Sequence, residues 1–507
     1  MIRFGRTCYC LFSLSFKSIT VVVRRCIFFA LVLMQSFQGS AKDYPASLFG
    51  IHSDGLTLNT RSIQAAINHI GENGGGKLVF YVGRYLTGSI HLKSNVYIEL
   101  KEGAVLLGSL NPYDYDKNGF TALILGAGQQ NIGISGQGVI DGQGRAVARN
   151  VVNLVHKGLL KDLFRNDRPQ EDHRPMIVYL RGCSNINIQG ITIRNAASWV
   201  QTYDQCKNLN IDKIYVDSKA YWNNDGIDIV DCDSVSVTNS YIDAADDGIC
   251  LKSHDDKAFC NNIVIRNNTI RSSANAIKFG TATYGGFKNV TITNNNVYDT
   301  YRSAIALECV DGGFLNNVVV DSLRVINTGN AIFLRLGERV VGKKGSLEKI
   351  KISNVYAEIP AVKPDAGYEY EGPIEDMPRN ISPIVIAGLP GQFISDVSFE
   401  NIEIKYPGGG SEFFANASLA RLDSIAEIPE KYPDFSMFKE LPAWGIYIRH
   451  AKNLQFSNIK LHCEKKDYRS PIVLDDVHAS RFAGINITQP GPKKPMHLHK
   501  STGIINK

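Results

Sequence analysis

Four aspartates in two matching frames are the residues of this chain whose types and spacing best suit chemistry. The frame Asp225–Asp228 (DGID) is matched twenty-two positions later by Asp247–Cys250 (DGIC), with Asp246 directly before it. If one circuit of the chain separates the frames, equivalent residues lie about 4.8 Å apart, the spacing of neighbouring strands. Asp225, Asp246 and Asp247 would then repel one another, which raises the pKa of at least one carboxyl. A proton donor beside proton acceptors suits acid/base hydrolysis of a glycosidic bond.

A repeated template predicts the elements that position these acids. Each copy starts with Asn and alternates apolar and polar residues. Directly adjacent copies lie 23 to 32 residues apart through Ile350, whereas Asn131 and Asn185, and Asn208 and Asn262, lie 54 residues apart. This pattern predicts an all-β fold, a single-stranded parallel β-helix with coils of three short strands. The Asn residues are interpreted as structural, since at turns they satisfy backbone groups or stack on one another. Copies begin at Asn131, Asn185, Asn208, Asn262, Asn289, Asn317 and Asn453.

A second set of aligned positions spans five coils and contains the acids. In each coil an Ile points inward, so the next residue points outward. The outward row reads Asp228, Cys250, Lys278, Ala306, Phe333, and the row two positions further on reads Val230, Lys252, Gly280, Glu308, Arg335. The cations of these rows, together with Arg302, could balance the charge of the acids on a solvated face. Because the cations form a row along the coil axis, however, the sequence favours a groove that binds an acidic polymer. The predicted substrate-binding residues are Asn223, Asp228, Lys252, Asn275, Lys278, Arg302, Glu308 and Arg335.

Composition excludes some functions and suggests export. Residues 1–41 contain five of the cations and no acid, so without them the formal charge of +6 falls to +1, and this gives no argument for a nucleic-acid partner. Arg24-Arg25, the apolar run Cys26–Met34 and Gly39-Ser40-Ala41 predict a cleavable signal peptide over 1–41, hence a secreted or periplasmic protein with no membrane span in its mature form. The remaining seven cysteines lack metal-ligand spacing and are interpreted as buried apolar fillers. Neither a metal nor a cofactor is predicted.

The rest of the mature chain, residues 42–507, is predicted to be one domain. A helix from about Thr60 to Ile70 before the first strands predicts a cap on the open end of the solenoid. Two long interruptions, 360–392 and 406–441, predict loops that wall the cleft, block one end of it and favour exo action. Their aromatic residues, which include Tyr432, could stack on sugars or pack the loops to the coils. Trp199 and Trp222 lie nearer the acids and are candidate sugar platforms.

These motifs resemble glycoside hydrolase family 28, the polygalacturonase and rhamnogalacturonan hydrolase family. The family's Asn-Thr-Asp motif is matched by Asn223-Asn224-Asp225 and its Asp-Asp motif by Asp246-Asp247, and the likeness covers about Ser47 to Asn486. The resemblance implies a right-handed β-helix and an inverting, monomeric pectin hydrolase. In that mechanism Asp246 is the general acid, and Asp225 with Asp247 hold and deprotonate the attacking water.

Two departures from the family pattern bear on the substrate. The Gly-His-Gly motif of polygalacturonases corresponds to Ala274-Asn275-Ala276, and the Arg-Ile-Lys motif that binds galacturonate corresponds to Ala306-Leu307-Glu308. The resemblance therefore implies a pectic polymer or oligomer other than simple homogalacturonan, with Lys278 or Arg335 replacing the missing contacts. A calcium-dependent lyase and a non-catalytic carbohydrate-binding β-helix remain as alternatives. The sequence leaves open the exact linkage and whether action is endo or exo.

Overall fold

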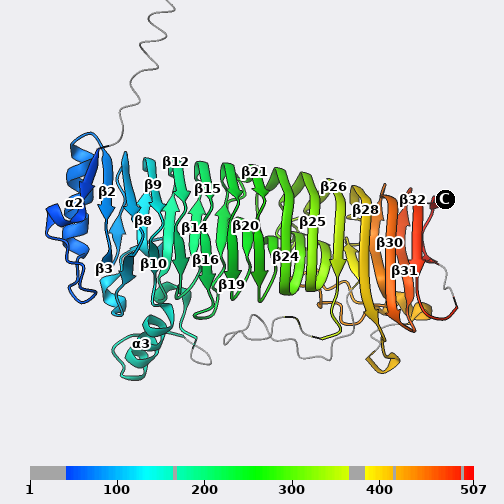
Figure 1. Ribbon diagram of the computed structural model, residues 1–507. Coiled ribbons are helices and arrows are strands. Elements are labelled where there is room, and N and C mark those ends of the chain that lie inside the picture. Colours follow the sequence, from blue (N-terminus) through cyan, green and yellow to red (C-terminus); the bar gives the residue numbers. More distant parts are fainter. Residues whose placement is uncertain (1–41, 164–167, 363, 365–382, 415–417, 493–495) are drawn as a thin grey trace, which may run out of the picture. The chain divides into compact units, whose positions relative to one another are not determined.

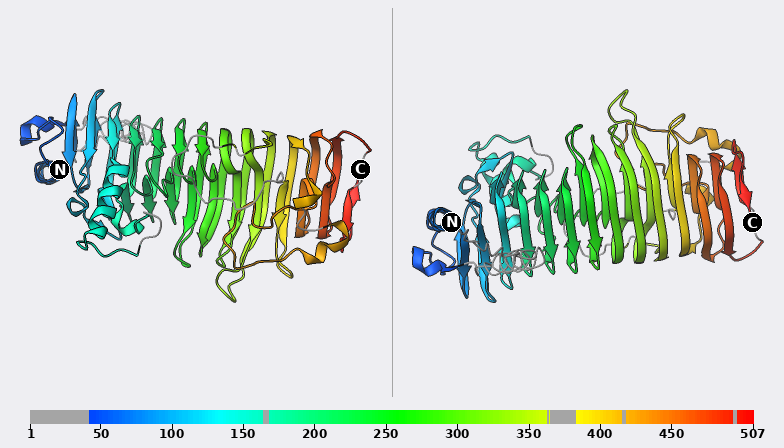
Figure 2. Two further views of the ribbon diagram at one scale, coloured as in Figure 1. Left: turned by 90° about the horizontal axis from the view of Figure 1, so that it is seen from below. Right: turned by 90° about the horizontal axis from the view of Figure 1, so that it is seen from above.

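Strands of the repeat pair in parallel with their counterparts one coil before and one coil after, as the computed structural model shows (Figure 1). The structure describes residues 42–163, 168–362, 364, 383–414, 418–492 and 496–507. From Asp43 onward they form one compact unit. The pairing is that of the predicted parallel β-helix, and two further views show the coils stacked along one axis (Figure 2). The predicted signal peptide, and the loop residues Tyr368, Tyr370 and Arg379, lie outside the described residues.

The strands of this unit form three parallel ladders along the coil stack. The ladder that bears the candidate site, called the site ladder, contains β4 (Ile90–His91), β8 (Phe120–Ala127), β11 (Met176–Arg181), β14 (Gln201–Asp204), β17 (Ile227–Val230), β20 (Ile249–Ser253), β23 (Ile277–Thr283), β27 (Ile384–Ala387), β29 (Ala443–Lys452), β31 (Ser470–His478) and β33 (His497–His499). The second contains β1 (Asp43–Pro45), β2 (Gly76–Phe80), β5 (Val96–Leu100), β9 (Gln130–Gly136), β12 (Ser184–Gln189), β15 (Lys207–Asp212), β18 (Asp233–Thr238), β21 (Cys260–Arg266), β26 (Ser346–Glu358), β28 (Ile394–Gly408), β30 (Gln455–Lys465), β32 (Arg481–Thr488) and β34 (Ile505–Asn506). The third contains β3 (Gly83–Thr87), β6 (Ala104–Gly108), β10 (Val139–Asp141), β13 (Thr192–Arg194), β16 (Tyr215–Ser218), β19 (Tyr241–Ala244) and β22 (Thr269–Ser272).

Several strands do not keep to one ladder, since β26, β28, β30 and β32 also continue the third ladder. The long strands β24 (Gly286–Cys309) and β25 (Phe314–Leu336) pass through successive ladders and pair with each other along most of their length. The two-residue β7 (Lys117–Asn118) pairs antiparallel with β8. The site ladder is therefore continued between β23 and β27 by the ends of β24 and β25.

The interior of the coils is apolar, as the alternating pattern predicts. The inward Ile residues at 227, 249, 277, 305 and 332 are fully buried in one continuous core. All seven described cysteines are free and buried, which agrees with their interpretation as apolar fillers. The Asn residues stack from coil to coil, for example Asn185 Nδ2 to Asn131 Oδ1 at 3.0 Å and Asn317 Nδ2 to Asn289 Oδ1 at 2.7 Å. Since each also has positive φ, the Asn ladder is structural, as predicted.

The described residues include two α-helices, α2 (Thr60–Glu72) and α3 (Gly144–His156). Helix α2 buries Ile63, Ile67 and Ile70 and contacts β2, β4 and β5 at the N-terminal end of the coils (Figure 1). Helix α3 leaves the coils between β10 and β11 and was not predicted. The 3₁₀ helices are η1 (Ala46–Phe49), η2 (Pro112–Asp114), η3 (Glu171–His173), η4 (Glu412–Phe414) and η5 (Leu419–Ser424). Among the residues described, no helix is long and apolar enough to cross a membrane.

Candidate active site

A pocket of about 250 Å³ opens over the site ladder and brings together six of the residues singled out from the sequence. The frame Asp225–Ile227 aligns with the later frame as predicted, because Gly226 N donates to Asp247 O and Ile227 N to Gly248 O. One coil of the β-helix thus places the three acids in one pocket. The predicted residues that line it are Asn223, Asp225, Asp246, Asp247, Lys252 and Lys278.

A buried asparagine holds the chain just before the first acid. Asn224 Oδ1 accepts from Ser218 Oγ at 2.8 Å, and its Nδ2 donates to the Ser198 carbonyl at 2.9 Å. The preceding Asn223 has φ of 57° and accepts through Oδ1 from the guanidinium of Arg174 at 2.8 Å. These bonds fix the turn from which Asp225 enters the pocket.

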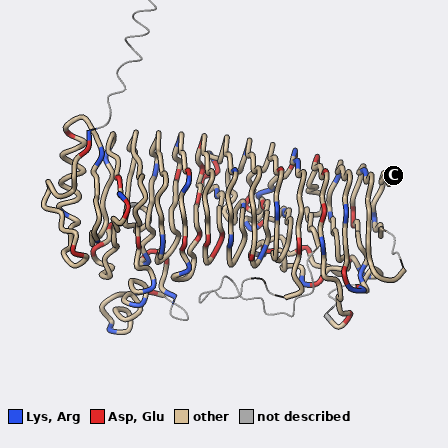
Figure 3. The backbone as a smooth tube through the Cα atoms, in the orientation of Figure 1, with Lys and Arg blue, Asp and Glu red and all other residues tan. Residues whose placement is uncertain are grey.

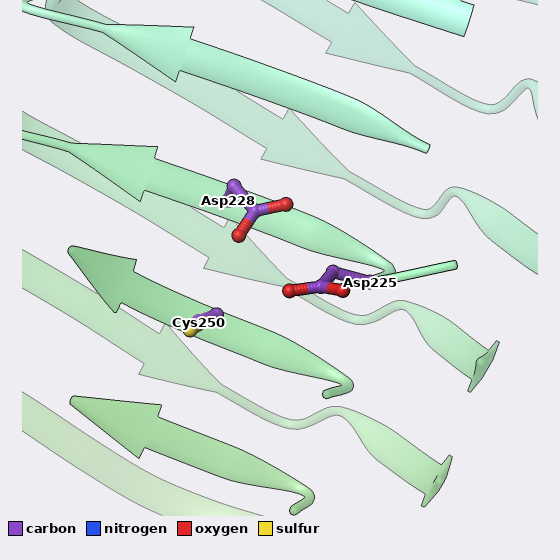
Figure 4. A group of neighbouring side chains, drawn as sticks. All are labelled: Asp225, Asp228 and Cys250. Atoms are coloured by element: carbon purple, nitrogen blue, oxygen red, sulfur yellow. The ribbon is translucent and has the colours of Figure 1, made fainter. Parts of the chain in front are cut away.

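Lys252 fills the centre of a cluster of three potential metal ligands. Asp225, Asp228 and Cys250 each offer one ligand atom, and these atoms lie within 4.8 Å of one another (Figure 4). Lys252 Nζ contacts all three residues, at 3.1 Å from Asp225 Oδ2, 2.7 Å from Asp228 Oδ1 and 3.0 Å from Cys250 Sγ. The buried ammonium therefore takes the position in which a cation would bind. Lys252 also lies over the ring of Trp199, 4.6 Å from its centroid.

Asp247 is held by the next coil of the ladder. Asn275, at the position of the family's missing histidine, donates from both its side-chain Nδ2 (2.8 Å) and its backbone N (3.0 Å) to Asp247 Oδ1. Lys278 Nζ lies 3.1 Å from the other oxygen, Asp247 Oδ2. Asn275 therefore orients the carboxylate of Asp247 and stabilises its ionised form.

The pKa values of the neighbouring acids Asp246 and Asp247 are shifted in opposite directions. Burial and the repulsion of Asp225 and Asp247 raise the pKa of Asp246 to about 7. Burial would also raise the pKa of Asp247, but the cations Lys278 and Lys252 outweigh it and hold that pKa at about 2. Burial raises the pKa of Asp225 well above its ordinary value. At neutral pH the site therefore holds a proton beside an ionised carboxylate, as the sequence predicted.

The predicted outward row of the site ladder is confirmed, with one shift in the row beside it. Asp228 pairs with Cys250, Cys250 with Lys278, and Lys278 with Ala306. After Leu251, however, the register shifts, so that Ser253 pairs with Thr283 and Gly280 does not take the expected place beside Lys252. The additional residues at this irregularity include Thr281 and Ala282, which line the pocket.

Five predicted substrate-binding residues do not line the pocket, which corrects the expectation of an open row of cations; they are Asp228, Asn275, Arg302, Glu308 and Arg335. Arg302, Glu308 and Arg335 are buried, and a later part of the chain covers Arg302 and Arg335. Asp434 pairs with Arg302 at 3.0 Å, and the Glu427 carbonyl accepts from Arg335 at 2.7 Å. Asp228 is also fully buried, beneath Lys252.

Six further residues line the pocket that the sequence analysis did not place among the site residues. Tyr432 comes from the predicted loop 406–441, and its hydroxyl accepts from Lys278 Nζ at 2.7 Å. Trp199, which was a candidate sugar platform, lines the pocket, whereas the partly buried Trp222 does not. Glu171 lies in the insertion after α3, where no repeat signals its position. The six are Glu171, Trp199, His254, Thr281, Ala282 and Tyr432.

Comparison with known proteins shows which proteins this chain is similar to. The model of the family described as "Glycosyl hydrolases family 28" matches residues 80–308. A probable polygalacturonase of Vitis vinifera is 30% identical over 236 residues, 42% of this chain and 45% of the relative. An exo-poly-alpha-D-galacturonosidase of Dickeya chrysanthemi is 28% identical over 248 residues, 40% of each protein. The chain thus spans less than half of the length of these curated relatives.

A solved structure agrees in fold. The hyperthermoactive exopolygalacturonase from Thermotoga maritima superposes with a TM-score of 0.61 over 83% of this chain and 91% of that chain, at 20% sequence identity. The segment that the family model matches includes Asp225, Asp246 and Asp247, the acids that meet in the pocket. Over residues 80–308 the chain is similar to glycoside hydrolase family 28.

Proposed function

We propose that the protein is an inverting glycoside hydrolase that cleaves galacturonosyl linkages in a pectic polysaccharide. The observation that best supports this is the pairing, in one pocket, of a half-buried Asp246 whose pKa is about 7 with an Asp247 whose pKa is about 2. The first can give a proton at neutral pH and the second is ionised. The relatives named as polygalacturonases support the pectic substrate class.

In the proposed reaction Asp246 protonates the glycosidic oxygen as the sugar–oxygen bond breaks. Water attacks the anomeric carbon from the opposite face, and Asp225 with Asp247 holds this water and accepts its proton. The ammonium of Lys252 lies beside Asp225 and opposes the rise in its pKa that burial causes, so it favours the ionised form that can accept the proton. The products are two saturated sugars, with one water added per cleavage and the anomeric configuration inverted.

The cations of the site favour a substrate other than plain polygalacturonate. Lys252 contacts Asp225 and Asp228, and Lys278 contacts Asp247 and Tyr432. Both ammonium groups are therefore already balanced by protein oxygens, and less of their charge is free for a sugar carboxylate. We place a rhamnogalacturonan-type polymer or oligomer ahead of homogalacturonan for this reason.

We also propose exo action. On the C-terminal side of the pocket, the segment Ile425–Leu441 contacts the site ladder through Tyr432, Asp434 and Phe438. A glycan that extends along the coils in this direction would meet Tyr432, so the open part of the cleft ends there. An exo enzyme releases short products of one size from the start of the reaction, and an endo enzyme releases a mixture of lengths.

Three finer features of the chain belong to the same proposal. We infer that the coils wind in the right-handed sense common to parallel crossovers. Helix α2 acts as the cap of the N-terminal end, since it covers β2, β4 and β5. The leader 1–41 would direct the protein to the periplasm or the outside of the cell, where pectic glycans occur.

A calcium-dependent lyase on the same fold is the second candidate. The one group of potential ligands in the pocket, among the described residues, is Asp225, Asp228 and Cys250, and Lys252 already contacts all three. A bound calcium ion would have to displace this ammonium, which makes the lyase the weaker proposal.

The deciding experiment is mass spectrometry of the products from polygalacturonate, rhamnogalacturonan I and oligogalacturonides, with and without a chelator. Hydrolysis gives saturated products that gain one water per cleavage and do not depend on the chelator. Unsaturated products that disappear with the chelator would show the lyase instead. Proton NMR of the first product would show whether the configuration is inverted.

A further inference from the structure

A second, larger pocket adjoins the acidic one on the site ladder. It has a volume of about 520 Å³, and His254 lines both pockets. They also meet through an aromatic contact, because Phe120 lines the larger pocket and its ring lies 5.8 Å from that of Trp199, which lines the smaller one. A sugar chain that enters the acidic pocket can thus continue directly into the larger one.

The larger pocket has aromatic walls. Tyr284 is 37% exposed and Phe120 is partly buried, so both offer ring surface, while Tyr179 is buried behind them. The floor is kept open at Gly119, whose φ is +87° and where a Cβ would lie 3.2 Å from the Tyr179 hydroxyl. Aromatic rings of this kind pack against the C–H faces of sugar rings.

The charge of the larger pocket is negative. Its lining includes three carboxylates, Asp204, Asp255 and Asp256, against one guanidinium, that of Arg181; outside the lining, Lys343 pairs with Asp256 at 3.3 Å. Arg181 Nε lies 3.4 Å from Asp204 Oδ2, which also accepts from the Tyr179 hydroxyl at 2.9 Å, so this guanidinium is already balanced. His254 adds no charge at neutral pH, because burial and the nearby Lys252 lower its pKa below the ordinary value.

We propose that this pocket is a subsite for a neutral sugar, a hexose or deoxyhexose that neighbours the cleaved uronosyl residue. Its carboxylates accept hydrogen bonds from sugar hydroxyls, whereas they repel a uronate, and a specific site excludes a wrong ligand by such repulsion. This inference rests on the proposed function and narrows its substrate to glycans in which neutral sugars alternate with uronates or branch from them.

The aromatic wall is tested with Tyr284→Ala and the matched control Tyr81→Ala, an exposed tyrosine near the N-terminal end of the coils. Substrates are linear alternating galacturonate–rhamnose oligosaccharides and oligogalacturonides of equal length. We expect Tyr284→Ala to lower kcat/KM on the alternating oligosaccharide about tenfold, mainly through KM, a change of about 1.4 kcal/mol. Tyr81→Ala should change nothing. An unchanged KM in Tyr284→Ala, or faster cleavage of oligogalacturonides by the native protein, would overturn the subsite.

The charge of the pocket is tested with Asp256→Lys. Asp256 pairs with Lys343 at 3.3 Å, and its control is Glu400→Lys, from the similarly exposed pair of Glu400 with Lys351 on the second ladder. We expect Asp256→Lys to lower KM for oligogalacturonides at least threefold and Glu400→Lys to leave it unchanged. Equal behaviour of the two variants would contradict the charge argument.

A binding experiment separates this inference from the proposed function. Calorimetric titration of Asp246→Asn protein with the two oligosaccharides, and with a galactose-branched one, reports the subsite without catalysis. If the linear alternating oligosaccharide binds more tightly than the oligogalacturonide, and Asp246→Asn/Tyr284→Ala loses this difference, the subsite binds a sugar of the glycan backbone. If only the galactose-branched oligosaccharide binds more tightly, the subsite binds a branch sugar. Failure of the native protein to cleave any pectic substrate would remove the proposed function, and equal binding of alternating and uronate oligosaccharides would remove the subsite.

Discussion

Two stretches of the site ladder have the same register, but a pocket opens over one of them and a later segment of the chain covers the other. In the coils from β17 to β23 the outward row contains Asp228, Cys250 and Lys278, and the surface above it opens into a pocket. In the coils from β24 to β31 the same row turns apolar and is covered. Its residues there are Ala306, Phe333, Val385, Tyr447 and Val473.

The apolar half of this row explains where the later segment packs. Leu422, Ile425, Phe435, Phe438 and Leu441 form one buried cluster with the row, which removes their apolar surface from water. The polar half offers no such surface, and there the segment contributes Tyr432 to the wall of the pocket that the acids also line. We call the two stretches the open coils (β17–β23) and the covered coils (β24–β31). The identity of the outward residue, and not the register, therefore decides which charged side chains of this ladder line the pocket.

Both stretches contain ion clusters, and these differ in what they can do. In the covered coils Arg449 lies 2.6 Å from Glu427 and 3.1 Å from Asp475, and the three serve the packing of the segment. In the open coils Lys252 and Lys278 shift the pKa values of acids that line the pocket. Acidic and basic residues are interspersed along the coils, so the distribution of charge alone would not distinguish the two clusters (Figure 3).

The largest expected effect is that of Asp246→Asn in the open coils. It removes the proposed proton donor, so kcat should fall by about 10²- to 10⁴-fold. The folded protein should keep its stability, because a carboxyl with a raised pKa gains nothing from its charge. Initial rates and thermal unfolding measure both quantities. Asp423→Asn, at an exposed acid bound by Lys500 near the covered coils, should retain activity within twofold. Full activity of Asp246→Asn would exclude its role as the acid.

Arg449→Met tests the covered cluster. The change leaves Glu427 and Asp475 without their shared cation, and the free energy of unfolding should fall by about 3 kcal/mol, as for other broken buried ion pairs. The folded fraction should keep its kcat, since Arg449 does not line the pocket. Denaturant unfolding followed by fluorescence measures the change.

The control for this variant is Lys460→Met, which breaks the more exposed pair with Glu403 and should cost less than about 1 kcal/mol. Equal stability of the two variants would show that the covered cluster is no more than a surface ion pair.

The register and the apolar core were predictable from sequence because their signals are local. Period-two alternation and turn Asn residues define each coil without reference to any other. Alignment of Asp225 with Asp247 follows from that period, so the acids could be found. Helix α3 and the pocket residue Glu171 lie in an insertion that contains no copy of the repeat, so the sequence pattern could not predict them. Burial of Arg302 depends on Asp434, more than a hundred residues away, and no local pattern reports such a contact.

The different pKa values of Asp246 and Asp247 predict how the activity depends on pH. Activity should fall as pH rises through about 7, because the acid Asp246 loses its proton. Below that pH Asp247 stays ionised to about 2 and can still accept the proton of the water, although Asp225, whose pKa is raised, becomes protonated first. Lys278→Met removes the cation that holds the pKa of Asp247 down, so the acidic limb should move up by one pH unit or more. The pH dependence of kcat/KM measures both limbs.

Lys343→Met, at an exposed lysine outside the acidic pocket, is the control and should leave the profile in place. An unmoved acidic limb in Lys278→Met would show that another group sets it.

The effect expected at Glu308, where the open and covered coils meet, is small at pH 5 and grows as the pH rises. Both its carboxyl oxygens are buried without a hydrogen-bond partner among the described residues, and burial raises its pKa to about 8. The folded protein therefore holds a proton that the unfolded chain loses near pH 4.5, so native stability falls as pH rises from about 4.5 to 8, by at most about 1.4 kcal/mol per pH unit. Glu308→Gln has no proton to lose. At pH 5 it should match the native protein in stability and activity, and its advantage in unfolding temperature should grow up to pH 8. A constant difference across this range would show that Glu308 is charged in the fold and belongs, like Lys278, to the working site.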